Sequence, residues 1–168
     1  MAPQMEDTEY LKAYDLFSDA IFRHCFFRIS DRELAKDLAQ ETFVRTWEYI
    51  SRGNEVQNLR ALLYRIANNL IIDEYRKKKM LRLEEMQESG FEPREDGHEK
   101  IEARSEALNA LRVLHKIEKE SRDLIIWRYV DGFGPKEIAE ISGTSENVIS
   151  VRLHRAMKKL KELLTNDE

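Results

Sequence analysis

Residues 134–164 read GPKEIAEISGTSENVISVRLHRAMKKLKELL, and this stretch decides the fold of the C-terminal half of the chain. Ala139, Gly143 and Ile149 have the spacing of a helix-turn-helix. A small residue lets two helices approach closely, a glycine permits the tight turn between them, and a branched apolar residue anchors the second helix inward. The pattern therefore predicts two helices joined by a tight turn at Gly143.

The second helix of this motif is basic. Thr144 or Ser145 can cap it at its N-terminus. Five cations follow along it: Arg152, Arg155, Lys158, Lys159 and Lys161. A helix with such cations can lie in the major groove of DNA and neutralise phosphates, so the motif predicts DNA binding. A helical hairpin with a solvated basic face is the alternative interpretation of the same pattern.

Composition limits the remaining possibilities. The chain has 168 residues, 36% charged and 42% apolar, which suits one ordinary soluble domain or two small ones. No apolar run approaches the roughly 20 residues that cross a bilayer, and no signal peptide is recognisable. We therefore expect a cytoplasmic protein with no membrane contact of its own. The single cysteine, Cys25, excludes an internal disulfide framework, and its apolar neighbours predict a buried thiol.

The net charge of −4 argues at first against a nucleic-acid binder, but the charges are unevenly distributed. Residues 60–82 hold seven cations against two acids, a net charge of +5. Residues 145–161 hold five cations against one acid, a net charge of +4. Residues 83–106 hold nine acids against three cations, a net charge of −6. Two basic segments thus flank an acidic one.

Apolar residues recur at helical spacing along most of the chain, whereas the alternation typical of strands is nearly absent. Helices are predicted over 8–28, 30–50, 58–82, 104–118 and 121–131, ahead of the helix-turn-helix. Ser30 and Glu33 form a capping box for the second of these helices. The inward stripe of the first helix is predicted to contain Leu11, Tyr14, Phe17, Ile21 and Cys25. The fold class is therefore predicted to be all-α.

A change of composition divides the chain. Residues 84–100 contain two glycines and a proline among dense acids and few apolar side chains, so burial cannot offset their ordering entropy. We expect a flexible acidic linker over 83–103. It would join two small helical domains, 8–82 and 104–168, of which the second contains the helix-turn-helix.

No arrangement of residues typical of an enzyme stands out. The four histidines are scattered without the spacing of metal ligands. There is no glycine loop for phosphates and no Gly-x-Ser-x-Gly turn. We expect no catalytic residue, no metal site and no cofactor.

The helix predicted over Asn58–Arg82 is a second candidate nucleic-acid element. Its apolar residues face inward, and the polar residues Arg60, Tyr64, Arg65 and Asn68 are expected on or beside the opposite side. Aromatic and amide groups among cations suit single-stranded DNA, where bases stack while cations follow the phosphates. Alternatively, the lysines only complement the dipole at the C-terminal end of the helix.

Three segments together resemble an extracytoplasmic-function (ECF) sigma factor, the initiation subunit of bacterial RNA polymerase. AKDLAQETFVRTWEYI, residues 35–50, resembles the helix of that family that binds core polymerase. ALLYRIANNLIIDEYRKKK, residues 61–79, resembles the helix that recognises and melts the minus-ten element. KEIAEISGTSENVISVRLHRAMKKL, residues 136–160, resembles the helix-turn-helix that reads the minus-thirty-five element.

The resemblance implies roles for particular residues. Core polymerase would be met by Asp37, Gln40, Glu41 and Phe43. The loop at 51–57 would hold a flipped promoter base, and the melted strand would pass Arg60, Tyr64, Arg65, Asn68, Asn69, Asp73, Arg76 and Lys77. In the minus-thirty-five element, bases would be met by Asn147, Ser150, Val151, His154 and Arg155, and phosphates by Arg152, Lys158 and Lys159. The chain departs from the family at Leu62, usually tryptophan, and at Ser150, commonly a cation.

The function implied by this resemblance is that of an alternative sigma factor that binds core polymerase and directs promoter recognition, DNA melting and initiation. An anti-sigma factor is open as a further partner. The rival interpretation is a dimeric helix-turn-helix regulator that is no polymerase subunit, although a flexible linker disfavours half-sites at fixed spacing. A polymerase adaptor or anti-sigma factor that does not read DNA is disfavoured by the basic second helix.

Overall fold

The computed structural model describes residues 6–89 and 106–166. The described elements are α1 (Asp7–Ile29), α2 (Arg32–Ser51), α3 (Leu59–Ser89), α4 (Glu106–His115), α5 (Lys119–Ile125), a π-helical turn η1 (Ile126–Val130), α6 (Pro135–Ser142) and α7 (Glu146–Asn166). No strand occurs among these residues, so the all-α prediction is confirmed. The chain divides into two compact units after Tyr75, a boundary that falls within α3.

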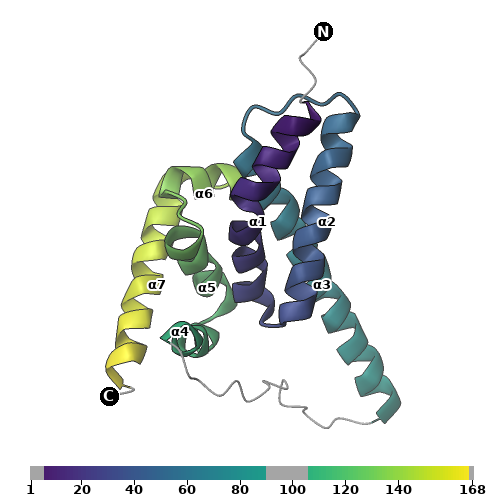
Figure 1. Cartoon of the computed structure of the whole chain (residues 1–168). Coiled ribbons are helices and arrows are strands. Elements are labelled where there is room, and N and C mark those ends of the chain that lie inside the picture. The colour runs from purple at the N-terminus through teal and green to yellow at the C-terminus, as the bar shows by residue number, and fades with distance from the viewer. Residues whose placement is uncertain (1–5, 90–105, 167–168) are drawn as a thin grey trace. The chain divides into compact units, whose positions relative to one another are not determined.

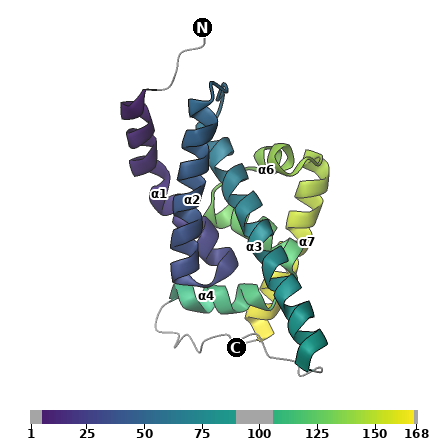
Figure 2. The same ribbon diagram turned by 90° about the vertical axis from the view of Figure 1, so that its right-hand side faces the viewer.

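In the N-terminal unit, α1 and α2 run side by side in opposite directions, and α3 follows them (Figures 1 and 2). The buried apolar residues of the three helices include Ile21, Cys25, Ala35, Leu38, Phe43, Leu63, Ala67, Leu70 and Ile71. The thiol of Cys25 is fully buried, as the sequence predicts. Burial raises the pKa of Tyr10, as does nearby Tyr14, and the Tyr10 hydroxyl donates to the Phe43 carbonyl.

The buried stripe of α1 differs from the predicted one. Leu11 and Tyr14 are exposed, whereas Ala13, His24 and Arg28 are buried. Burial follows the 3.6-residue repeat of the helix, and that repeat here passes through one small and two polar side chains. A stripe drawn through the large apolar residues therefore predicts the wrong buried side chains near the N-terminus of α1.

The turn between α1 and α2 also corrects the predicted capping box. Ser30 ends α1 in the left-handed conformation, with φ of 60°, and its N–H donates to the Phe26 carbonyl at 2.8 Å. Asp31 is the residue that caps α2, because its carboxylate accepts from the Leu34 N–H at 3.1 Å. Ser30 is therefore the C-terminal cap of α1, and Asp31 is the N-terminal cap of α2.

Helix α3 continues to Ser89, beyond the predicted end at residue 82. Residues 83–89, expected in the linker, are helical because leucine, methionine, glutamate and glutamine favour helix, and the first glycine comes only at Gly90. The remainder of the predicted linker, from residue 90, lies outside the described residues.

The C-terminal unit is organised around α7, which packs against α4, α5 and α6. Its core includes Leu114, Ile117, Ile125, Ile126, Trp127, Phe133, Ile138, Ile149 and Leu153. The rings of Trp127 and Phe133 meet edge to face, with centroids 5.3 Å apart. The helix predicted over 121–131 is present as α5 and η1, and the Asp131 N–H donates to the Ile126 carbonyl at 2.9 Å. Gly132, with φ of 77°, then reverses the chain.

Replacing Asp31 by alanine should lower the free energy of unfolding of the N-terminal unit by about 1 kcal/mol, because the Leu34 N–H loses its capping acceptor. Asp31→Asn keeps an acceptor at the same position and should stay close to the parent protein. Urea denaturation followed by circular dichroism measures both. Equal losses in the two variants would mean that the carboxylate contributes through its charge and not as a cap.

Candidate nucleic-acid interface

The turn between α6 and α7 has the geometry that its sequence predicts. Gly143 has φ of 71°, in the left-handed region that favours glycine. The Thr144 N–H donates to the Ala139 carbonyl at 3.1 Å, which closes the end of α6. Ala139 and Ile149 are both buried, so the small residue and the branched anchor lie in the core as expected. The predicted helix-turn-helix is therefore confirmed.

The structure decides between the two candidate caps of α7. The Ser145 hydroxyl accepts from the Val148 N–H at 3.3 Å, and the Ser145 carbonyl accepts from the Ile149 N–H at 3.1 Å. The Thr144 hydroxyl instead lies 3.2 Å from that of Ser142. Ser145 is the N-terminal cap, and it fixes where α7 begins.

One face of α7 is buried and the opposite face is open. Ile149, Leu153 and Ala156 point into the core. All the residues expected to meet the minus-thirty-five element are exposed: Asn147, Ser150, Val151, Arg152, His154, Arg155, Lys158 and Lys159. Because residues three and four positions apart are neighbours on a helix, these side chains form one continuous surface, which we call the α7 face.

On α3, most of the predicted nucleic-acid residues also share one side. Arg65, Asn69, Asp73, Arg76 and Lys77 are exposed and follow one another at intervals of about one turn. Arg60 and Asn68 are half-buried beside them. We call this set the α3 face, and it carries three exposed cations, the half-buried cation Arg60, two amides and one acid.

Tyr64 does not belong to the α3 face, contrary to the prediction. Its side chain is only 2% exposed, and its ring meets that of His24 edge to face with centroids 5.0 Å apart. The Arg60 guanidinium lies over it, 5.6 Å from the ring centroid. Tyr64 falls next to Leu63 on the inward stripe, so its ring lies in the core of the N-terminal unit.

The loop between α2 and α3 is polar and exposed, apart from half-buried Val56. It is held at both ends by local hydrogen bonds. Gly53, with φ of 84°, donates to the Ile50 carbonyl at 3.0 Å, and the Asn54 side-chain amide donates to the Tyr49 carbonyl at 2.9 Å. Asn58 accepts from the Ala61 N–H at 3.1 Å and so caps α3. The loop is therefore anchored to two helices while its middle stays accessible.

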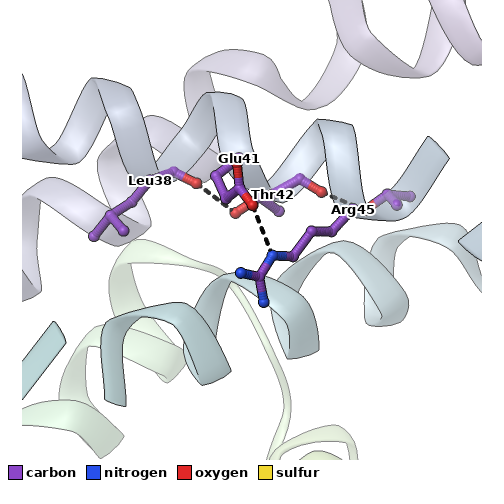
Figure 3. Close-up of polar contacts among 5 residues, drawn as sticks. Leu38, Glu41, Thr42 and Arg45 are labelled. Carbon is purple, nitrogen blue, oxygen red and sulfur yellow. Dashed lines mark hydrogen bonds and ion pairs between the residues drawn. The ribbon is translucent and has the colours of Figure 1, made fainter. Parts of the chain in front are cut away.

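The residues expected to meet core polymerase divide into two groups. Asp37 and Gln40 are exposed on α2, and Glu41 is half-buried in an ion pair with Arg45 at 2.8 Å (Figure 3). Phe43 is only 5% exposed and packs against the Tyr14 ring, with centroids 4.7 Å apart. Phe43 therefore supports the helix from the core side, while the other three lie on the outer side.

Two buried threonines lie on the inner side of α2, opposite its outer side. The Thr42 hydroxyl donates to the Leu38 carbonyl at 2.7 Å, and the Thr46 hydroxyl donates to the Thr42 carbonyl at the same distance (Figure 3). Each hydroxyl is thus satisfied within its own helix, which lets threonine fill a close helix–helix contact. Sequence analysis missed one exposed apolar residue on the outer side, Val44, and one on α7, Val148.

Between residues 6–89 and 106–166, no group of three or more His, Cys, Asp or Glu side chains is placed to hold a metal ion. Over the same ranges, none of the helices has both the length and the apolar character that crossing a bilayer requires.

Tyr64→Ala should lower the free energy of unfolding of the N-terminal unit by about 3–5 kcal/mol, since it removes a buried ring. Tyr64→Phe keeps the ring in the core and should bind single-stranded DNA as the parent does. Urea denaturation and fluorescence anisotropy test the two statements. A stable Tyr64→Ala protein with weakened DNA binding would make the ring a stacking group after all.

Comparisons with known proteins cover both units. The family model for Sigma-70 region 2 matches residues 13–80, and that for Sigma-70, region 4, matches residues 107–160. RNA polymerase sigma factor YlaC of Bacillus subtilis is 30% identical over 155 residues, which are 90% of this chain and 90% of YlaC. ECF RNA polymerase sigma factor BldN of Streptomyces coelicolor is 28% identical over 161 residues, and the match spans 93% of this chain but 60% of BldN.

A solved structure agrees with the fold. That of CnrH in complex with the cytosolic domain of CnrY superposes with a TM-score of 0.73 at 23% identity, covering 97% of this chain and 92% of that one. The two matched regions, in this order, and the identity to YlaC over nearly the whole of both chains lead to one conclusion. The chain belongs to the sigma-70 family, among the ECF RNA polymerase sigma factors.

Proposed function

We propose that this protein is an alternative sigma factor, which binds core RNA polymerase, places it on a promoter and stabilises the melted strand. It acts as a specificity subunit and not as an enzyme, in the compartment that holds the polymerase and the chromosome, the cytoplasm. The observation that carries the proposal is the presence of two separate polar, cation-bearing faces, on α3 and α7, in a chain that belongs to the sigma family.

The α7 face suits double-stranded DNA. The buried side of α7 fixes which residues are turned outward, and a single exposed helix fits the width of the major groove. Asn147, Ser150, Val151, His154 and Arg155 would meet base edges in the minus-thirty-five element. Arg152, Lys158 and Lys159 would lie nearer the phosphates, where they add affinity without sequence information.

The α3 face suits the melted minus-ten element. Guanidinium and ammonium groups would follow the phosphates, and the amides of Asn68 and Asn69 would hydrogen-bond unpaired bases. Because Tyr64 is buried, stacking would fall to the planar guanidinium of an arginine such as Arg65. The anchored loop at residues 52–58 would hold a flipped base, since its polar middle is accessible beside a basic helix.

The outer side of α2 is proposed to meet core polymerase through Asp37, Gln40 and Glu41. Two of these residues are acidic, and they would complement a basic surface on the partner. The two domains are proposed to lie on either side of the acidic segment, and α3 continues beyond the first compact unit to Ser89. Binding to polymerase would raise the effective concentration of each domain at its own promoter element. Since the sigma factor RpoE of Bartonella quintana, whose structure has a TM-score of 0.69 to this chain, was solved in complex with the anti-sigma factor NepR, an anti-sigma factor is a further proposed partner.

Co-purification with core RNA polymerase is the direct test of this function. A complex that initiates transcription from selected promoters is expected. If the chain failed to bind polymerase and instead bound a palindromic duplex as a dimer, the function would be that of a regulator outside the polymerase.

Arg155→Ala should weaken recognition of the upstream element by about 1–3 kcal/mol, because it removes a base contact. Lys159→Ala should weaken binding to all sequences alike, since phosphates carry no sequence information. The affinity of the holoenzyme is measured on a promoter and on the same promoter with a mutated upstream element. An unchanged ratio in Arg155→Ala would show that this residue does not read bases.

The triple variant Asp37→Ala, Gln40→Ala, Glu41→Ala should stay folded and lose core polymerase. These side chains are exposed or half-exposed, and the surface ion pair to Arg45 contributes at most about 1 kcal/mol to stability. Circular dichroism and a pull-down decide the outcome. Its control is Glu9→Ala, Lys12→Ala, Asp15→Ala, the same number of alanine substitutions on the exposed side of α1, which should retain polymerase. Full polymerase binding by the α2 variant would move the interface elsewhere.

A further inference from the structure

The α7 face contains an apolar group at its centre. Val151 follows Ile149 by two positions, which places it about 200° around the helix axis from that buried anchor. Its side chain is 50% exposed. Val148, one turn earlier, is 38% exposed. Two branched apolar side chains are therefore neighbours on α7: Val151 faces away from the core, and Val148, about 100° from Ile149, lies on the flank of the helix.

The surroundings of this pair are polar. Asn147 lies one turn before Val151, while His154 and Arg155 lie one turn after it. Single exposed apolar residues are common on protein surfaces and require no explanation. Here, however, Val151 occupies the middle of the α7 face, with Val148 at its edge. The other members of that face can hydrogen-bond to bases or neutralise phosphates, and valine can do neither.

The major groove offers one apolar group to such a side chain. Among the four bases, only thymine presents a methyl group there, at C5, and apolar side chains recognise thymine through that methyl. A branched side chain buries it without needing a hydrogen-bond partner. The stiffness of valine at χ1 also means that little rotamer freedom is lost on contact.

We propose that Val151, with Val148 beside it, reads the C5 methyl group of a thymine in the minus-thirty-five element. This inference rests on the proposed function, because it requires α7 to lie in the major groove. It assigns to the two valines a base preference that hydrogen-bonding residues of the α7 face do not supply. The discriminated feature is a methyl group, so thymine is preferred to uracil at the same position.

The test uses the full chain assembled with core RNA polymerase and an upstream element selected by that holoenzyme from a randomised duplex library. Each thymine of the selected element is replaced in turn by uracil, which keeps every hydrogen-bonding group and lacks only the methyl. At one or two positions, the affinity of the parent holoenzyme should fall about fourfold, the effect of exposing one methyl group. Val151→Ala should bind the thymine and uracil forms equally at those positions.

The variants should fold, because Val151 is exposed and alanine is the better helix former. Leu164→Ala removes a branched apolar side chain that is also 50% exposed on α7 but lies outside the α7 face, and it should keep the parent's thymine-to-uracil ratio. The inference is overturned if no thymine responds to uracil, if Val151→Ala responds as the parent does, or if the selected element lacks thymine.

Two other readouts test the proposed function separately: assembly of the holoenzyme, and selection of any specific sequence. A holoenzyme that selects a sequence but ignores the methyl overturns only the reading by Val151. A chain that does not assemble with polymerase, or selects no sequence, overturns the proposed function and this inference with it.

Discussion

The burial of one side of α7 is the constraint on which the rest of the C-terminal unit depends. Ile149, Leu153 and Ala156 recur at intervals of three or four residues and are withdrawn from solvent by α4, α5 and α6. That packing fixes the rotation of α7 about its own axis. The polar residues of the opposite side need no interaction of their own to be presented together, because the helix repeat places them there. The left-handed turn at Gly143 and the Ser145 cap set where this face begins.

The same logic governs α3, with a different consequence. Its inward stripe contains Leu63, Tyr64, Ala67, Leu70 and Ile71. With a tyrosine on that stripe, the aromatic group that could have stacked on nucleic acid instead fills the core beside His24. The exposed side is left with cations and amides. Affinity for a melted strand would then come mainly from electrostatics and guanidinium stacking, and should be strongly dependent on salt.

The core of the N-terminal unit also contains polar groups. Arg28 is buried, and its guanidinium lies 2.9 Å from Nδ1 of His24 and donates to the His24 carbonyl at 3.1 Å. The Tyr75 hydroxyl donates to the Arg28 carbonyl, which ties the middle of α3 to the end of α1. Buried polar groups of this kind cost free energy unless they are hydrogen-bonded, so they favour one relative position of the two helices. The part of the α3 face next to Tyr75 is thereby held in place against α1.

The sequence by itself determined the all-α class, the helix-turn-helix with its glycine turn, and the polar character of the α7 face. These three features depend on local residue spacing and on residues with special backbone conformations. Both can be recognised in the sequence without knowledge of tertiary contacts. Only the tertiary structure decided that Tyr64 and Phe43 lie in the core, that Leu11 and Tyr14 do not, and that Asp31 caps α2 in place of Ser30. Which of two adjacent residues is buried depends on how neighbouring helices pack, because an amphipathic aromatic ring fits either environment. The sequence also did not reveal that α3 ends at Ser89, because the dense acids of this segment suggest a linker while the same residues are good helix formers.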